Sequence, residues 1–149
     1  MTPEQVVRDF LTTFETKGAA AATPYLADNS TVNVVNPPIQ GGRDLFIGLG
    51  ALLKEALPDY KWGVQQMTTQ GNNVTVTARW TGTQTGPFKL SAFMPGMPDV
   101  PASGKKVSVP DKFIFTVSGD KISGLKIDSG PNGGLPDMLK QLGVQLPPQ

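Results

Sequence analysis

The stretch NVTVTARWTGTQTGPF, residues 73–88, carries the clearest strand pattern in the sequence. Four apolar residues alternate there with polar or charged ones: Val74, Val76, Ala78 and Trp80. This period of two is typical of a strand with one face on a core. The following Thr81–Pro87 mixes glycine and proline with threonine, so the strand must leave the sheet in a bend rather than enter a helix. We therefore predict a long central strand that ends at the mouth of a pocket.

Helices are predicted before this strand. Thr2 can cap the first one, because Pro3 suits a first turn and Gln5 completes a capping box. Gly18 marks its end. Residues 19–26 can form a second, short helix, and leucines at helical spacing predict a third over residues 45–56.

Further strands follow from alternation and from turn residues. Residues 31–35 alternate as a strand after a break at 27–30. The two prolines in Asn36–Gly42 make that segment a rim loop, because proline lacks the N–H donor. Gly71–Asn72 predicts the hairpin turn before the central strand. Other strands are expected over residues 60–68, 104–117 and 121–128, the last two joined by a turn at 118–120.

Several motifs resemble one family. Residues 79–88 resemble the "RW…GTHTG.F" strand of the SnoaL-like polyketide cyclases, which belong to the nuclear transport factor 2-like superfamily, with Gln84 at the position of the histidine. Residues 58–60 resemble that family's "FPD(L/Y)" corner, residues 118–122 its "DGKI" hairpin, and residues 134–143 its terminal helix. The resemblance implies an α+β cone, in which N-terminal helices pack on a strongly curved, mostly antiparallel sheet that encloses an apolar pocket.

Length and composition narrow the class of protein. The chain fits one domain over residues 1–149, and 13 basic against 12 acidic residues leave a net charge of +1. The longest run of basic residues is Lys105-Lys106, so the charge pattern does not indicate nucleic acid or an anionic membrane as a partner. The amino terminus resembles neither a signal peptide nor a membrane span. We therefore expect a cytoplasmic protein without either kind of partner.

The sequence contains no histidine and no cysteine. Ser-His-Asp and Cys-His catalysis are therefore excluded, and without imidazole or thiolate ligands we predict no metal site. Carboxylate, lysine, tyrosine and amide chemistry remain. A carboxylate in an apolar pocket can act as a general base, because desolvation raises its pKa toward neutrality. Cyclases and isomerases of this fold work in this way, and neither needs a cofactor.

Asp128 is the candidate base. The resemblance implies a catalytic aspartate near this point. Counted from the "GKI" hairpin, the family position falls nearer Ile127, so a one-residue shift or bulge would bring Asp128 into the pocket. With regular alternation, Lys126 and Asp128 lie on one side of the last strand, opposite Leu125 and Ile127. Alternatively, Asp128 only opens the turn before the terminal helix.

Other candidate binding residues are polar or aromatic. The family's second polar position falls near Phe113, which cannot relay protons. Asp111 could share the cavity, or it could belong to an ordinary edge-strand break at Pro110. Gln84 could donate a hydrogen bond to a ligand carbonyl without titrating. The remaining candidates are Tyr25, Asn33, Asn36 and Trp80; Asn36 could also be a turn residue, and Trp80 a core residue.

Residues 84–104 form an unusually long loop. It carries apolar side chains, among them Phe88, Phe93 and Met94, together with four prolines. A polar linker would not expose so much apolar surface. Three interpretations remain open: a lid over an apolar cavity, a contact between subunits, or an arm that only packs on the sheet.

Two functions of different class follow. The first is a cofactor-free cyclase or isomerase, in which Asp128 removes a proton α to a carbonyl of a bulky apolar substrate while Gln84 or an asparagine polarises the oxygen. The second is a non-catalytic domain that binds a small hydrophobic molecule in the same cavity. A protein-interaction domain has less support. We also predict a homodimer formed sheet to sheet, because the outer face of such a sheet is expected to be apolar and to need covering.

Overall fold

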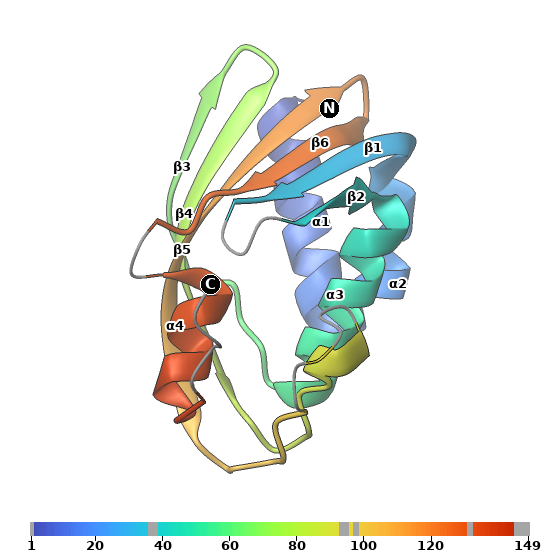
Figure 1. Cartoon of the computed structure of the whole chain (residues 1–149). Coiled ribbons are helices and arrows are strands. Elements are labelled where there is room, and N and C mark those ends of the chain that lie inside the picture. Colours follow the sequence, from blue (N-terminus) through green and yellow to red (C-terminus); the bar gives the residue numbers. More distant parts are fainter. Residues whose placement is uncertain (1, 36–38, 93–95, 97–98, 131–132, 145–149) are drawn as a thin grey trace.

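One curved, open sheet and the helices packed on it make up the protein (Figure 1). The computed structural model describes residues 2–35, 39–92, 96, 99–130 and 133–144. The helices are α1 (Pro3–Lys17), α2 (Ala19–Ala22), α3 (Arg43–Ala56) and α4 (Gly134–Gln141), with short 3₁₀ turns η1 (Thr23–Tyr25) and η2 (Leu90–Ala92). The strands are β1 (Leu26–Val34), β2 (Ile39–Gly42), β3 (Val64–Gln70), β4 (Asn73–Thr83), β5 (Lys106–Ser118) and β6 (Lys121–Ile127). The predicted α+β class is confirmed.

The first helix begins and ends where the sequence indicates. The Thr2 hydroxyl accepts a hydrogen bond from the Gln5 N–H at 3.2 Å, and the Gln5 side chain accepts one from the Thr2 N–H at 2.9 Å. This reciprocal pair satisfies two backbone donors at the start of the helix. Gly18, with φ of 93°, ends it. The rings of Phe10 and Phe14 then pack on Phe46 of α3, with centroids 5.5 and 6.0 Å apart.

The sheet has the order β2-β1-β6-β5-β4-β3. The last four strands form the predicted antiparallel meander, whereas β1 pairs with β6 in parallel and β2 pairs with β1 antiparallel. β4 was predicted as the central strand; it is an interior strand, but it lies next to the edge strand β3 rather than at the centre of the sheet. β5 is longer, with 13 residues, and pairs with both β4 and β6. Figure 1 shows α1 and α3 on one face of the sheet and α4 beside β5.

Two predicted irregular segments are strands. β1 already begins at Leu26, so the predicted break at 27–30 is wrong; a shift of register between Leu26 and Thr31 accommodates these residues within the strand. The predicted rim loop is also wrong for residues 39–42, which form the edge strand β2. Edge positions tolerate such sequences because only one side of the strand is paired. The first part of that loop, residues 36–38, lies outside the described residues.

The strand predicted over residues 60–68 begins at Val64. Before it, Lys61 forms only an isolated bridge with Thr81. Gly63 then adopts φ of 59°, and a Cβ atom there would lie 2.1 Å from the Arg79 carbonyl oxygen. The chain therefore needs glycine at this point, and the close approach separates the corner at Tyr60 from the regular strand.

Pro110 lies inside β5, so the predicted edge-strand break at Pro110-Asp111 is wrong. Pro110 is opposite Arg79, whose N–H donates to Gly63 on the far side of β4. The Arg79–Pro110 pair is therefore not hydrogen-bonded, and the missing N–H of proline removes no ladder bond. On its other side β5 pairs with β6 only from Phe113 onward. The first half of β5 is thus an edge on that side, where proline is tolerated.

The outer face of the sheet is polar. Exposed side chains there include Thr77, Arg79 and Lys112. Among the described residues of the protein, Val35 and Val64 are the exposed large hydrophobic ones, and each is less than half exposed. The expectation of an apolar outer face is wrong, because the polar residues of the alternating strands face water. Along the described ranges, no helix has both the length and the apolar sequence that crossing a membrane requires.

Candidate functional site

A cavity lies between the sheet, α1, α3 and the start of α4. It offers about 110 Å³ of room for the centre of a water molecule, which is comparable with the roughly 150 Å³ of an engineered apolar cavity that takes up benzene. Its walls are mainly aromatic and aliphatic. The lining residues are Phe14, Val34, Ile39, Phe46, Leu49, Gly50, Leu53, Tyr60, Trp62, Trp80, Phe88, Asp111, Phe113, Ile127, Ser129 and Leu135. The cavity is therefore of the same order of size as one that holds a single ring.

Interlocking aromatic rings form one wall of the cavity. The Trp62 ring lies 5.1 Å from Phe14, 5.3 Å from Tyr60 and 5.1 Å from Phe113, all between centroids. The contacts with Tyr60 and Phe113 are edge-to-face, a favoured geometry for such rings. Tyr60 also packs against Trp80, at 5.6 Å. Because each ring is held by others, the wall is stiff.

Asp111 is the carboxylate that lines this cavity, and it is only 8 % exposed. The Trp80 Nε1–H donates to its Oδ2 at 3.0 Å, and the Lys112 backbone N–H donates to its Oδ1 at 2.9 Å. Burial raises the pKa of Asp111; hydrogen bonds from Trp80, Ser129 and Lys112 oppose this, and the nearby charge of Asp128 adds to it. No cation is among these causes. The balance favours a carboxyl group that binds a proton more tightly than a free aspartate does.

Two glycines at the start of α4 allow the chain to pass close to Asp111. A Cβ atom on Gly133 would lie 2.4 Å from the Pro110 carbonyl oxygen. One on Gly134 would lie 2.1 Å from the Ser129 hydroxyl and 3.7 Å from the Asp111 Oδ2. Larger residues would therefore force this turn away from β5. The glycines keep the segment closed over the carboxylate, which helps to bury it.

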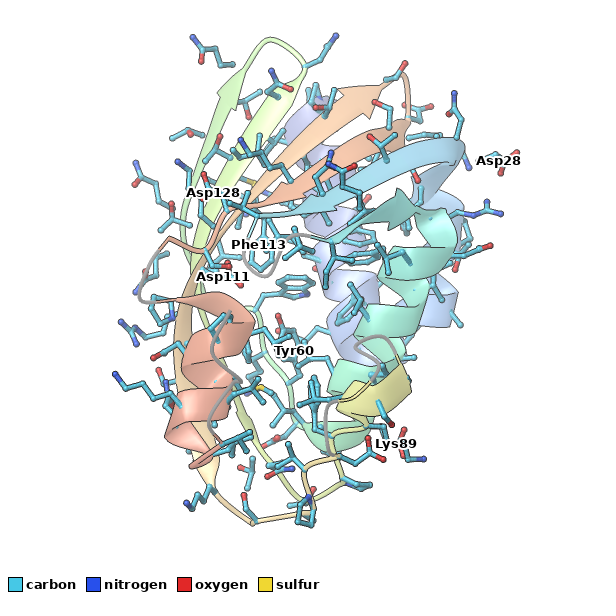
Figure 2. All side chains as sticks on the ribbon, in the orientation of Figure 1. Asp28, Tyr60, Lys89, Asp111, Phe113 and Asp128 are labelled. Atoms are coloured by element: carbon cyan, nitrogen blue, oxygen red, sulfur yellow. The ribbon has the colours of Figure 1, made fainter. Side chains whose placement is uncertain are left out.

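Asp128 is not among the residues that line the cavity. It follows β6, and its backbone N–H donates to the Lys112 carbonyl at 2.9 Å. Its neighbours Ile127 and Ser129 do line the cavity, as regular alternation requires. The register shift between β5 and β6 lies instead near Thr116, at the far end of the pairing. In Figure 2, Asp111, Phe113 and Tyr60 lie between the sheet, α3 and α4, and Asp128 lies above them in the view.

The other predicted binding residues divide into three groups. The cavity brings together Trp80, Phe88, Asp111 and Phe113. Tyr25, in η1, and the exposed Asn33 do not line it. Asn36, Phe93 and Met94 lie outside the described residues.

Gln84 is buried but does not line the cavity. Its side-chain amide donates to the carbonyls of Val100 and Pro101, at 3.3 and 3.1 Å, and accepts from the Ser103 hydroxyl at 2.6 Å. Its backbone bonds with Lys105 and Gly104, both at 2.8 Å. With all these partners inside the protein, Gln84 closes the base of the 84–104 loop.

Tyr60 and Trp62 are cavity residues that the sequence analysis did not propose. Both follow the Pro58-Asp59 corner, and their i, i+2 spacing in an extended segment was the available signal, because such residues face the same side. Burial, with the charges of Asp111 and Glu15, raises the pKa of Tyr60 well above its ordinary value. Its hydroxyl therefore stays protonated at neutral pH. Within the described ranges, no three acidic side chains gather to hold a metal ion.

Comparison with protein families identifies one that this chain matches. A family model described as SnoaL-like domain matches residues 7–125. A proposed SnoaL-like polyketide cyclase from Jannaschia sp. CCS1 is 25 % identical over 85 % of this chain and 83 % of its own, with a TM-score of 0.68. IdmH, a proposed polyketide cyclase from Streptomyces antibioticus, is 18 % identical over 97 % and 100 % of the two chains, with a TM-score of 0.70.

A third solved structure has the same fold. It is a protein from Catenulispora acidiphila with a ketosteroid isomerase-like fold, 17 % identical over 97 % of this chain and 96 % of its own, with a TM-score of 0.68. No protein with a curated description matches significantly.

Proposed function

Since the chain belongs to the SnoaL-like domain family, we propose that it binds a small apolar carbonyl compound in this cavity. We further propose that Asp111, rather than Asp128, removes a proton from the carbon next to the carbonyl group. The observation that carries this proposal is a buried carboxylate, without a paired cation, in an otherwise apolar cavity. Such a group is a stronger base than an exposed aspartate, because water no longer stabilises its charged form.

The proposed step is a proton transfer. One oxygen of the Asp111 carboxylate takes the α-proton, and the electron pair of the C–H bond moves into the carbonyl group to form an enolate. An isomerase returns the proton from Asp111 to another carbon of the enolate. In a cyclase, the enolate carbon attacks a second carbonyl carbon of the same substrate; the π bond of that carbonyl breaks, and its oxygen takes the electron pair and then the proton from Asp111. Trp80 and Lys112 hold the carboxylate in place through their hydrogen bonds. No cofactor takes part in this scheme.

The size of the cavity defines what part of a substrate it holds. About 110 Å³ accommodates one ring. The rest of a bulky polyketide-like substrate would extend toward the 84–104 loop, which contributes Phe88 to the wall. The reacting carbonyl would then lie on the enclosed ring, near Asp111.

Deuterium exchange tests the proposal without knowledge of the natural substrate. The ketone 1-indanone has exchangeable protons next to its carbonyl group, and NMR in D₂O follows their loss. We expect the wild-type protein to accelerate this exchange and Asp111→Asn to reduce the acceleration by about a hundredfold or more, with binding retained. Asp128→Asn serves as the matched variant and should leave the exchange largely unchanged.

The results separate the alternatives. Loss of exchange in Asp128→Asn but not in Asp111→Asn would return the role of base to Asp128. Binding of 1-indanone without any acceleration by the wild-type protein would favour the second candidate function, a non-catalytic domain that binds hydrophobic ligands. The predominantly apolar lining is the observation that supports that candidate.

A further inference from the structure

Trp62 lines the cavity and carries a buried hydrogen-bond donor. The residue is 5 % exposed and lines the cavity, and its Nε1 is a buried atom without a hydrogen-bond partner in the described part of the protein. A buried donor without a partner is costly, because the water that it bonds in the unfolded chain is not replaced. Native proteins rarely leave such a group unsatisfied without a reason.

The other tryptophan differs in this respect. The Trp80 Nε1–H donates to the Asp111 carboxylate at 3.0 Å. Both indoles line the same cavity, and they are the two tryptophans of the chain. The N–H of Trp80 is therefore bonded to the candidate base, whereas the N–H of Trp62 has no partner among the described residues.

The surroundings of Trp62 hold its indole in place. Its backbone N–H donates to the Glu15 side chain at 2.9 Å, which ties the segment to α1. Three rings pack around the indole, with centroids 5.1 to 5.3 Å away. This packing prevents the indole from turning toward solvent. Since no described residue supplies an acceptor for this N–H, we consider a molecule that enters the cavity as its source.

We propose that the Trp62 Nε1–H donates a hydrogen bond to the oxygen atom of the bound ligand. The ligand class is an apolar compound with one ring in the cavity and a carbonyl oxygen on that ring. An indole N–H can only donate, so it selects an acceptor and gains nothing from a hydrocarbon. The orientation, with the α-carbon toward Asp111, rests on the proposed function, but the hydrogen bond itself does not. If an enolate forms, its negative oxygen strengthens the bond, so Trp62 also contributes to the reaction.

Indole N–H signals in a ¹⁵N–¹H NMR spectrum test this assignment. The chain gives two such signals, and Trp62→Phe identifies one by its loss. The two probes are 1-indanone and indane, which share a bicyclic frame but differ in the carbonyl oxygen. We expect 1-indanone to move the Trp62 signal downfield, as a new acceptor does, and indane to cause no such change.

Affinities give the second readout. Removal of the N–H by Trp62→Phe should lower the affinity for 1-indanone relative to indane by about tenfold. Phe113→Leu is the matched control, because it alters the same wall without removing a donor and should weaken both probes alike. An unmoved Trp62 signal in wild-type protein saturated with 1-indanone would overturn the proposal. So would an unchanged ratio of affinities in a folded Trp62→Phe variant.

The outcome is separable from that of the proposed function. If Asp111 is not a base, Asp111→Asn leaves deuterium exchange unaffected while 1-indanone still moves the Trp62 signal. If Trp62 is not the donor, the signal stays in place while exchange still depends on Asp111. The wild-type spectrum decides the question even if Trp62→Phe fails to fold.

Discussion

Asp111 occupies an unexpected place on β5. The two positions where the family resemblance implies polar groups hold Phe113 and Ile127 here, and these residues pair directly across β5 and β6. The buried carboxylate lies two residues before Phe113, on the part of β5 that β6 does not reach. Because residues two apart on a strand face the same side, the side chains of Asp111 and Phe113 both line the cavity. This chain thus carries its buried carboxylate two residues away from the position at which the resemblance implies a polar group.

The raised pKa of Asp111 predicts a specific dependence of stability on pH. A folded state that binds the proton more tightly than the unfolded chain gains stability below the ordinary pKa of 3.8 and loses that gain as pH rises through the folded value. Asp111→Asn cannot ionise. The melting temperature of the variant should therefore rise relative to that of the wild-type protein between about pH 4 and about pH 7.

Circular dichroism melts at several pH values measure this difference. Asp9→Asn is a suitable control, because it removes an exposed carboxyl on α1. A difference between Asp111→Asn and wild type that stays constant over this range would contradict the raised pKa and weaken the assignment of Asp111 as base.

Individual site residues were only partly predictable. Alternation correctly placed Asp128 opposite Ile127, but it could not show which side faces a cavity. The role of Asp111 was left open because Pro110 suggests a break in the strand. Only the pairing of β5 with β4 shows that the missing N–H of Pro110 removes no hydrogen bond between the strands. Gln84 was expected to contact a ligand, whereas its side-chain amide forms hydrogen bonds with other residues of the 84–104 loop. An amide has the same hydrogen-bonding groups in either role, so sequence alone does not distinguish them.

At the scale of the element, α3 contains two glycines in very different surroundings. A Cβ atom on Gly48 meets nothing within 4 Å, whereas one on Gly50 would lie 2.6 Å from the Phe14 ring and 3.0 Å from Ala19. Gly48→Ala should stabilise the protein by about 0.5–1 kcal/mol, because alanine favours helix. Gly50→Ala should destabilise it by about 1–3 kcal/mol through overpacking. Urea unfolding compares the two; a stabilising Gly50→Ala would show that α1 and α3 can separate easily.

The described part of the 84–104 loop is packed against the rest of the protein. Phe88 and Val100 exchange two backbone hydrogen bonds at 2.8 Å, and both side chains are buried. Lys89 forms an ion pair with Glu55 of α3 at 3.1 Å. A Cβ atom on Gly86 would lie 2.1 Å from the Glu55 carbonyl oxygen, so the chain passes close to the end of α3. The base of the loop is therefore part of the core. The lid interpretation is left for residues 93–98, of which all but residue 96 lie outside the described residues.

Removal of residues 93–98 tests the lid. This deletion keeps Val100 and the base of the loop, so we expect the melting temperature to change little while the affinity for 1-indanone falls. Gln84→Ala is the contrasting variant, because it leaves two carbonyls without a donor and should cost about 1–3 kcal/mol of stability. If the deletion lowers stability as much as Gln84→Ala does, residues 93–98 belong to the core or to a subunit contact.

Elements with strong local signals were predicted well. Thr2 and Gly18 bound α1, and Gly71 and Gly119 adopt the positive φ angles that their hairpin turns require. β1 and β2 were predicted less well, because their polar residues pair with neighbours that are distant in sequence. β2 follows prolines and contains two glycines, so only its pairing with β1 makes it a strand.

At the scale of the whole molecule, the homodimer remains a prediction. The polar outer face removes the apolar driving force that motivated it, so a sheet-to-sheet contact would have to rely on polar side chains and bridging water. We still expect a dimer at micromolar concentration. Light scattering should then give twice the chain mass of 15.8 kDa. A mass of one chain at all concentrations tested would exclude this dimer.

Because both tryptophans line the cavity, the intrinsic fluorescence of this protein excited at long ultraviolet wavelengths originates entirely from its pocket wall. A compound that enters should alter emission intensity or wavelength, with no dye, label or assay of turnover. Libraries of metabolites could therefore be screened against the unmodified protein to identify its natural ligand. Trp62→Phe and Trp80→Phe would then assign each response to one of the two indoles.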